Sequence, residues 1–348
     1  MSRLADWLEE EVAAGSFPGG AALVGSADAV LASAWAGRAA IEPAPDPLAE
    51  ETLFDLASLT KPLATGALVR QALGRGLSLA DPPGRFLPEW KRTRFEGVTV
   101  ERLLTHTSGL PAWFPLYARG EGAAAYRRTL AGLSPERPPG TAVVYSDVGF
   151  LVLGEILEEL QAAPLDRCYD ALVAGPAKSS ALFLPGSESS CAATERGDRY
   201  ERAMTERLGL TYARFRDGVV RGEVHDGNAH RRGGVAAHAG LFGTATDVWR
   251  LARAWLDPAG SELTRDRTPE LPEARGLAWQ GARGAGSAVP EFPEDAFGHT
   301  GFTGTSIWIV PPRDRIFILL TNRIHPEVRE VNFHEVRRRF HRIALALL

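Results

Sequence analysis

The sequence has few of the features that mark secreted, membrane-bound or disulfide-rich proteins. It contains two cysteines in 348 residues, Cys168 and Cys191, which form neither a disulfide framework nor a CxxC pair. No apolar run approaches the roughly 20 residues that cross a membrane. The acidic opening "MSRLADWLEEEVAAG" lacks the basic segment and apolar stretch of a signal peptide. We therefore expect a cytoplasmic protein without a membrane span, although a chain trimmed of its leader would look the same.

Positive charge is also not in excess. Lysine and arginine number 39 against 43 aspartates and glutamates, so the formal net charge is −4. The sequence therefore lacks the excess of positive charge that is typical of nucleic-acid-binding proteins, which argues against a nucleic-acid partner. The hydrophobic fraction of 45% is enough for a sizeable core. We expect a small-molecule or peptide-like substrate as the partner, and the sequence leaves the oligomeric state open.

Both ends of the chain carry strand patterns. Residues 19–37 predict two apolar strands joined by a polar turn near 26–28, and residues 304–311 and 315–322 predict two more. We expect these strands to form one antiparallel sheet, flanked by helices that include 4–13 and 244–256, the latter capped by Thr246 or Asp247.

The middle of the chain has a different character. Helical patterns lie within 98–111 and at 148–161, separated by long loops rich in glycine, proline and serine. The sequence thus predicts an α+β fold: a single domain, 1–348, with an α/β lobe (1–75 and 240–348) and an inserted, mostly helical lobe (76–239).

The stretch "DLASLTKPLATGALV", residues 55–69, contains the first candidate site. Pro62 is accepted only in the first turn of a helix, so the helix is predicted to begin no earlier than about Leu59. Ser58 then lies at the helix mouth, with Lys61 on the same face. A serine becomes a nucleophile when a base takes its proton, and a lysine with a lowered pKa can serve as that base. The same pattern also fits an N-cap serine beside a surface lysine.

Two further segments carry candidate chemistry. In "GTAVVYSDVGF" (140–150), Asp147 is a suitable N-cap, whereas Tyr145 could share a proton with Lys61, since an ammonium lowers a phenol's pKa. In "FGHTGFTGTSIWIVP" (297–311), a glycine-rich turn precedes a strand whose backbone N–H could support an oxyanion. The glycines there could also let a substrate approach the backbone.

These three segments resemble the ordered motifs of the penicillin-recognising serine hydrolases, in particular the branch of class C β-lactamases, D-alanyl-D-alanine carboxypeptidases and esterases. Similar flanks, such as "FPGGAALV", "LLTHTSGLP" and "GGVAAHAGLFGTATDVWRLA", extend the resemblance over nearly the whole chain. It implies a β-lactamase/transpeptidase-like catalytic domain that needs no cofactor or metal. It also implies a role for each matching residue: Ser58 as acylated nucleophile, Lys61 and Tyr145 in proton transfer, the backbone N–H groups of Ser58 and Phe302 as oxyanion hole, and Asp147, His299, Thr300 and Gly301 in substrate binding.

Two positions depart from the family pattern. Asp147 stands where asparagine is usual, and an ionised carboxylate can accept but not donate a hydrogen bond. His299 stands where many members have lysine, and a neutral imidazole lacks a fixed positive charge. We therefore expect an esterase, a D-amino-acid peptidase or at most a weak β-lactamase, with preference for esters or amides that lack a carboxylate.

Other residues leave alternatives open. His225, His230 and His238 could serve a metal-dependent hydrolase, although their spacing matches no familiar zinc pattern. A catalytically silent binding protein is the other alternative. His106 is expected to support a turn, and the run Arg337–Arg339 is expected to form a solvated face.

Overall fold

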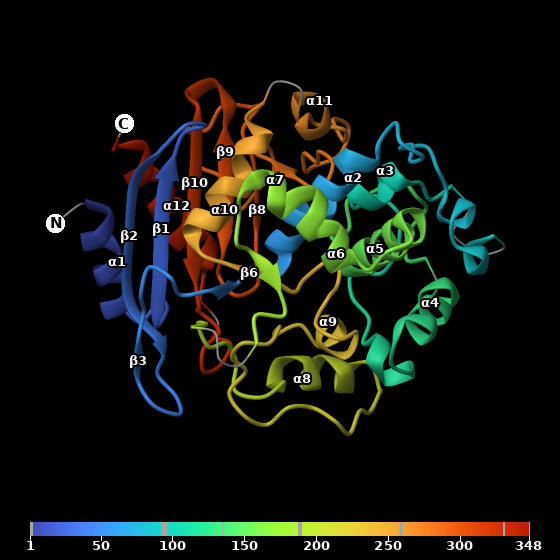
Figure 1. Cartoon of the computed structure of the whole chain (residues 1–348), viewed down its shortest axis with the longest axis horizontal. Helices are drawn as coiled ribbons and strands as arrows, with labels where there is room; N and C mark the ends of the chain where they lie inside the picture. The colour runs from blue at the N-terminus through green and yellow to red at the C-terminus, as the bar shows by residue number, and fades with distance from the viewer. Residues whose placement is uncertain are drawn as a thin grey trace.

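A seven-stranded antiparallel sheet forms one side of the molecule in the computed structural model (Figure 1). The structure describes residues 3–91, 97–133, 135–186, 190–257, 260–329 and 331–347. In spatial order the strands are β3 (Asp46–Pro47), β2 (Val30–Ala40), β1 (Gly19–Gly25), β10 (Arg315–Thr321), β9 (Ser306–Val310), β8 (Phe297–Thr300) and β7 (Gln280–Gly281).

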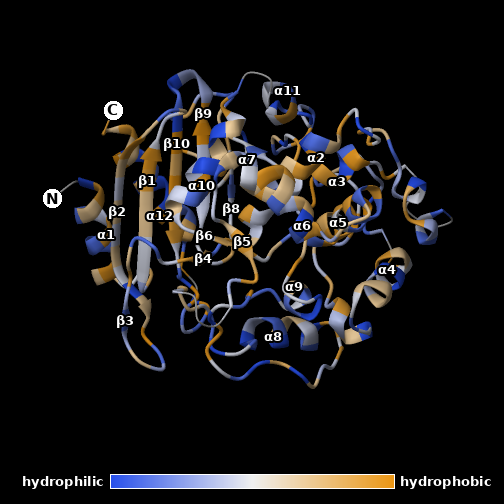
Figure 2. Ribbon diagram, viewed as in Figure 1, coloured by the Kyte–Doolittle hydropathy of each residue, from blue (hydrophilic) through white to orange (hydrophobic). Residues whose placement is uncertain are grey.

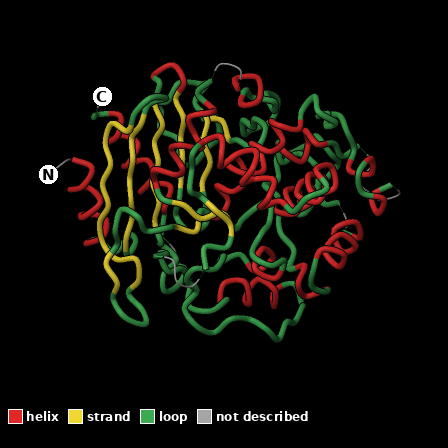
Figure 3. Tube along the Cα trace, in the orientation of Figure 1, coloured by secondary structure: helices red, strands yellow, loops and turns green. Residues whose placement is uncertain are grey.

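The pairing of β1 with β10 joins the two ends of the chain. Their antiparallel register sets Leu23 opposite Ile318 and Val24 opposite Phe317. This confirms the prediction of one sheet built from early and late strands. Figure 3 shows the long strands gathered on one side and most of the helices on the other. The boundaries proposed for the two lobes remain a prediction.

Side chains of β10 alternate between two hydrophobic cores, because successive residues of a strand point to opposite faces. Ile316, Ile318 and Leu320 pack into the core shared with the helical part. Phe317 and Leu319 pack on the other face, against helices α1 (Arg3–Ala13) and α12 (Phe333–Leu345). Figure 2 shows the corresponding hydrophobic colouring along the central strands. Both faces of the sheet are therefore covered, as the α+β prediction requires.

The remaining helices cover the first core or build the helical part. They are α2 (Ala67–Ala72), α3 (Val100–Leu104), α4 (Ala123–Gly132), α5 (Asp147–Gln161), α6 (Leu165–Tyr169), α7 (Gly175–Ala177), α8 (Arg199–Arg207), α9 (Gly227–Arg231), α10 (Ala245–Ala252) and α11 (Ser261–Thr264). A second, three-stranded sheet has the order β4 (Phe54–Asp55), β6 (Leu241–Gly243), β5 (Leu182–Phe183).

The cap predicted for α10 was wrong. Thr244 is the N-cap: its hydroxyl accepts from the Asp247 N–H, and the Asp247 side chain accepts from the Thr244 N–H. Asp247 is therefore the third residue of a capping box, which a serine or threonine opens and an acidic side chain closes. Thr246 takes no part in it.

The cysteines and the helix lengths bear on the predicted lack of disulfides and of a membrane span. Cys168 and Cys191 are both free and buried, so they form no disulfide. Among the helices of the described chain, none combines the length and the hydrophobicity that a bilayer crossing needs.

Candidate active site

The nucleophile candidate lies on a tight turn after strand β4. Residues Ala57–Leu59 form a 3₁₀ turn, and Lys61–Gly66 continue as a π-helix before α2 begins. The helical turns thus start two residues earlier than predicted, and Ser58 lies inside the first one. Pro62 still occupies the first turn of its helix, where its missing N–H is tolerated. Ala57, just before the serine, has a φ of 48°, a conformation that costs a non-glycine residue free energy.

Lys61 connects the three motifs. Its ammonium lies 3.0 Å from Ser58 Oγ and donates to the His238 carbonyl at 3.1 Å. It forms an ion pair of 2.6 Å with the Asp147 carboxylate and lies 4.9 Å from the centre of the Tyr145 ring. The Lys61 side chain is fully buried. The structure therefore brings Ser58, Lys61, Tyr145 and Asp147 together, as the motif order implied.

The proton affinities differ from those we expected. Burial alone would lower the pKa of Lys61, but the adjacent Asp147 carboxylate, with a smaller contribution from Tyr145, raises it overall. Burial raises the pKa of Tyr145, although the Lys61 charge opposes that shift. The prediction of a lysine with a lowered pKa beside an acidified phenol was wrong, because Asp147 supplies a negative charge where the family pattern has a neutral amide.

Asp147 was also expected to cap the helix that follows it. The N-cap is instead Ser146, whose hydroxyl accepts from the Gly149 N–H at 3.0 Å. Asp147 is the first helical residue of α5, and its carboxylate is free to pair with Lys61. His106 supports this junction, as predicted: its Nδ1 accepts from the Ser146 N–H at 2.9 Å.

The third motif lies at the end of strand β8 and in the turn that follows. His299, Thr300 and Gly301 border the same cavity as Ser58, and so does Phe302. Among the described residues, the N–H groups of Ser58 and Phe302 have no acceptor outside their own turns. Both groups therefore remain available to a ligand in the cavity.

The position of Gly301 has no room for a side chain, and its role in substrate binding stays a prediction. A Cβ at this position would lie 2.1 Å from Thr305 Oγ1 and 2.8 Å from the Leu56 carbonyl oxygen. The space is thus needed by the protein itself, since the turn packs directly against the chain before Ser58. Thr305 Oγ1 donates to that Leu56 carbonyl at 3.1 Å.

His299 is a neutral hydrogen-bond acceptor. Its Nδ1 lies 2.9 Å from the Thr300 carbonyl oxygen, which can only accept, so Nδ1 carries the proton. Its buried Nε2 has no partner within the described structure. Burial and the nearby Lys61 and Arg275 charges hold the pKa of His299 well below its usual range. The expectation that this position lacks a fixed positive charge is therefore confirmed.

Asp55, which connects the two halves of the site, was not among the predicted site residues. Its buried carboxylate accepts from the Ala57 N–H and the His225 N–H, both at 2.8 Å. The ring of His225 stacks on Phe302 with centroids 5.6 Å apart. Asp55 therefore holds the Ser58 turn and the residue beneath Phe302 in one hydrogen-bonded unit. Its position three residues before the serine was the available signal.

The cavity in front of Ser58 has a volume of about 570 Å³. Seven of the candidate residues line it: Ser58, Tyr145, Asp147, His299, Thr300, Gly301 and Phe302. Three arginines, Arg275, Arg323 and Arg337, line it as well. The prediction of a solvated face was wrong for Arg337, which is 5% exposed. Its spacing of four from the buried Phe333 and three from the buried Phe340 could have indicated this.

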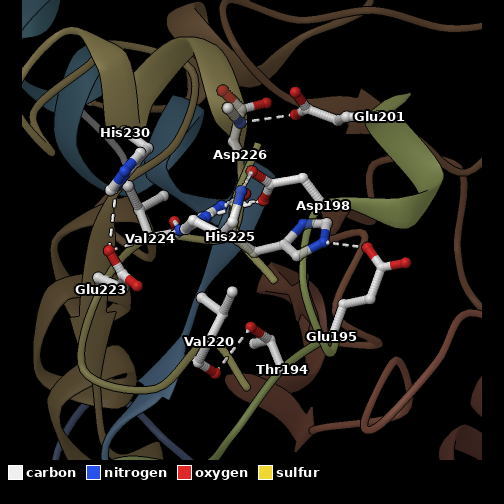
Figure 4. A network of polar contacts seen from close by, with 12 residues as sticks. Thr194, Glu195, Asp198, Glu201, Val220, Glu223, Val224, His225, Asp226 and His230 are labelled. Atoms are coloured by element: carbon white, nitrogen blue, oxygen red, sulfur yellow. Dashed lines mark hydrogen bonds and ion pairs between the residues drawn. The ribbon is translucent and has the colours of Figure 1, made fainter. Parts of the chain in front are cut away.

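The three candidate metal ligands each contact a different carboxylate. His225 contacts Glu195 at 2.9 Å and His230 contacts Glu223 at 3.2 Å (Figure 4). His238 contacts Asp226 at 2.8 Å. Within the described residues, no group of three histidine, cysteine or acidic side chains is arranged to hold a metal ion. These histidines therefore form ion pairs or hydrogen bonds rather than one ligand set.

The chain as a whole resembles proteins of one known family. The family model described as Beta-lactamase matches residues 4–339, so the chain belongs to the β-lactamase family. It is an enzyme of the serine hydrolase type found in that family.

Two curated relatives illustrate the range of named activities. The N-acetylmuramyl-L-alanine amidase of Bacillus subtilis (strain 168) is 29% identical, with 94% of this chain and 82% of the relative covered. A putative D-alanyl-D-alanine carboxypeptidase of Salmonella agona (strain SL483) is 27% identical, with 94% and 84% covered.

Solved structures agree on the fold. A class C β-lactamase has a TM-score of 0.74 at 19% identity, covering 99% of this chain and 97% of its own. The hydrolase EstCE1, described as having promiscuous acyltransferase activity, has a TM-score of 0.73 at 20% identity, with 99% and 97% covered. A penicillin-binding protein homologue from Pyrococcus abyssi, described as octameric, has a TM-score of 0.73 at 19% identity, with 99% and 77% covered.

Proposed function

We propose that this protein hydrolyses an ester or amide through an acyl-enzyme formed on Ser58. The supporting observation is the distance of 3.0 Å between Lys61 Nζ and Ser58 Oγ beside the cavity. A base within hydrogen-bond distance of a serine hydroxyl is the geometry that nucleophilic catalysis needs.

The proposed reaction has two stages. In enzyme molecules whose Lys61 is a free amine, Ser58 Oγ gives its proton to Lys61 and attacks the substrate carbonyl carbon. The carbonyl oxygen takes up the negative charge between the N–H groups of Ser58 and Phe302. The bond to the leaving group then breaks, and the proton passes from Lys61 through Tyr145 to the departing atom. Water attacks the Ser58 ester in the second stage, releases the acid and restores the serine.

We propose that the substrate is an amide of an amino acid. An amide of an amino acid is favoured by the names of the two curated relatives, an amidase for N-acetylmuramyl-L-alanine and a carboxypeptidase for D-alanyl-D-alanine. A simple ester should also react, since the proposed machinery acts on the carbonyl group.

Intact-protein mass spectrometry tests this proposal. The protein is incubated separately with a fluorophosphonate and with a penicillin, and Ser58→Ala is the control. We expect a fluorophosphonate adduct that is absent from Ser58→Ala. A penicillin adduct on Ser58 would extend the substrates to β-lactams. No adduct from either reagent would contradict the proposal and favour a catalytically silent binding protein.

A further inference from the structure

Strand β2 forms an open edge of the large sheet over most of its length (Figure 1). One side of β2 pairs with β1 from Val30 to Gly37. On the other side, β3 pairs only with Arg38 and Ala40. Within the described chain, residues 30–36 therefore have no strand neighbour on that side. Such an edge can accept a strand from another chain.

The backbone groups of this edge point away from the sheet. The Gly37 carbonyl accepts from the Leu48 N–H at 3.1 Å, on the side of β3. In an antiparallel ladder, every second residue directs both its N–H and its C=O to the same side. The register of β2 against β1 is unbroken from Ala32 to Gly37, so Ser33 and Trp35 direct their backbone groups to the open edge. These groups are free to form a new ladder.

The side chains of the edge are apolar and exposed. Val30, Leu31 and Trp35 are 38%, 48% and 41% exposed, respectively. Residues 30–37 contain no charged residue and no proline. Natural sheet edges are usually protected by lysine, proline or strong bulges, and β2 has one irregularity, near its first residues. The edge therefore lacks most of the devices that prevent pairing.

Only one face of β2 is covered by a helix. On that face, three alanines pack into or against the core that contains Leu4 and Trp7 of α1: Ala32, Ala34 and Ala36. The residues between them point to the opposite face, because side chains alternate along a strand. These residues, Ser33 and Trp35, are exposed, as is Leu31. A strand added at the edge would extend this uncovered face.

Two opposite charges bracket the uncharged run. Asp28 and Arg38 lie equally far before and after Ser33 in the sequence, and both are exposed. Neither has an ionic partner within 4.0 Å in the part of the chain that the structure describes. An antiparallel second copy with Ser33 on the two-fold axis brings Asp28 of each copy to Arg38 of the other. The same register sets Leu31 across from Trp35, so the edge is complementary to itself.

We propose that β2 is a dimer interface, at which two copies of this chain join their large sheets. The two β2 strands pair antiparallel, with Ser33 of both copies at the two-fold axis. Such an interface uses the same surface on both subunits and closes after two copies. It does not depend on the proposed function, because residues 30–38 do not line the cavity in front of Ser58. Both cavities remain open in the dimer.

Sedimentation velocity and light scattering test the oligomeric state. We expect the wild type to have twice the mass of one chain. Trp35→Lys places a charge on the edge and should give a monomer. Leu208→Lys is the matched control, because Leu208 is also apolar and 52% exposed but lies after helix α8. It should stay dimeric, and circular dichroism and urea unfolding should show that both variants fold. A monomeric wild type, or a folded Trp35→Lys that remains dimeric, would overturn the interface.

Charge reversal tests the register. Asp28→Arg sets like charges against Arg38 twice in the dimer and should raise the dissociation constant about tenfold. Adding Arg38→Asp to the same chain restores both opposite-charge pairs and should return the dissociation constant to near the wild-type value. A double variant that associates as weakly as Asp28→Arg would contradict the proposed pairing.

A cross-link tests the position of the axis. Paired residues of an antiparallel ladder have Cα atoms about 4.5–5.5 Å apart, within the span of a disulfide. The two native cysteines are buried, so an introduced surface cysteine should be the one that reacts. Mild oxidation should convert Ser33→Cys to a covalent dimer and leave the control Leu208→Cys uncrosslinked. Absence of the cross-link in a dimeric Ser33→Cys would place the interface elsewhere and overturn the proposal.

Discussion

The ion pair between Lys61 and Asp147 leads to a quantitative prediction about pH dependence. The two groups are 2.6 Å apart, and the lysine is fully buried. With an effective dielectric constant of about 20, Coulomb's law gives a gross attraction of about 6 kcal/mol at this distance. Asp147→Asn removes the charge and keeps the shape. Burial then dominates, so the pKa of Lys61 should fall from its raised value.

The expected shift follows from the fraction of this attraction that survives relaxation and solvent access. If one third remains, about 2 kcal/mol, the acid limb of the kcat/KM profile moves down by about 1.5 pH units. At a pH on that limb, Asp147→Asn should then be about thirtyfold faster than the wild type. The change in rate arises because a larger fraction of Lys61 is present as the free amine that takes the Ser58 proton.

The assay is hydrolysis of p-nitrophenyl acetate between pH 6 and 9, corrected with Ser58→Ala. Asp217→Asn is the matched control, because the Asp217 side chain is 92% exposed and lies in a surface pair. A profile of Asp147→Asn that overlays the wild type would refute the reasoning. Loss of activity at every pH would refute it too, and would make the Asp147 carboxylate a required proton acceptor.

The same ion pair has a stability consequence with a definite sign. The Lys61 pKa is raised in the folded state, so the pair stabilises the fold at pH values below the unfolded pKa of about 10.4. This contribution is lost as the pH rises through the raised folded value. The stability advantage of the wild type over Asp147→Asn in urea unfolding should therefore be present at pH 7 and shrink above pH 10.

Three further substitutions test the structural assignments by urea unfolding. Asp55→Ala leaves two buried N–H groups without acceptors and should cost about 2–6 kcal/mol, with a fall in kcat; wild-type kcat would contradict its positioning role. Glu155→Ala leaves two arginines without their buried partner and should cost about 3–5 kcal/mol, whereas a loss below about 1 kcal/mol would show that water replaces it. Thr244→Ala opens the capping box of α10 and should cost about 1 kcal/mol, and an unchanged midpoint would refute that cap's contribution.

The parts of the fold that could be predicted are those with a local hydrophobic signal. The continuous apolar run within residues 315–321 reflects a strand with a hydrophobic core on each face, and its antiparallel partner β1 is the matching apolar strand at the other end of the chain. Helix α5 could be predicted because its apolar residues recur at helical spacing, and the structure buries them over most of the length of the helix. Helix starts were less predictable. Near each start several side chains could accept a hydrogen bond from the free N–H groups, and the sequence does not show that Ser146 and Thr244 do so rather than Asp147 and Asp247.

The site was predictable where short motifs carry the chemistry and less so where distant segments meet. Ser58 and Lys61 are three residues apart, so a helical turn suffices to bring them together. Arg337 reaches the Gly301 carbonyl across 36 positions of the chain, and no local pattern reports such a contact. The direction of the Lys61 pKa was likewise hidden, since it depends on an ion pair with a residue 86 positions away rather than on burial alone.

These long-range contacts share one consequence for the proposed oxyanion hole. The Ser58 N–H and the Phe302 N–H belong to turns more than two hundred residues apart, and an oxyanion hole works only if both stay fixed. Thr303 Oγ1 donates to the Asp55 carbonyl at 2.8 Å, while the Asp55 carboxylate accepts from the backbone on the other side. Asp55 thus bonds to both turns through different atoms. The two N–H groups are therefore positioned relative to one another by the buried residue Asp55, and the preorganisation of the candidate site depends on that residue as much as on the motifs.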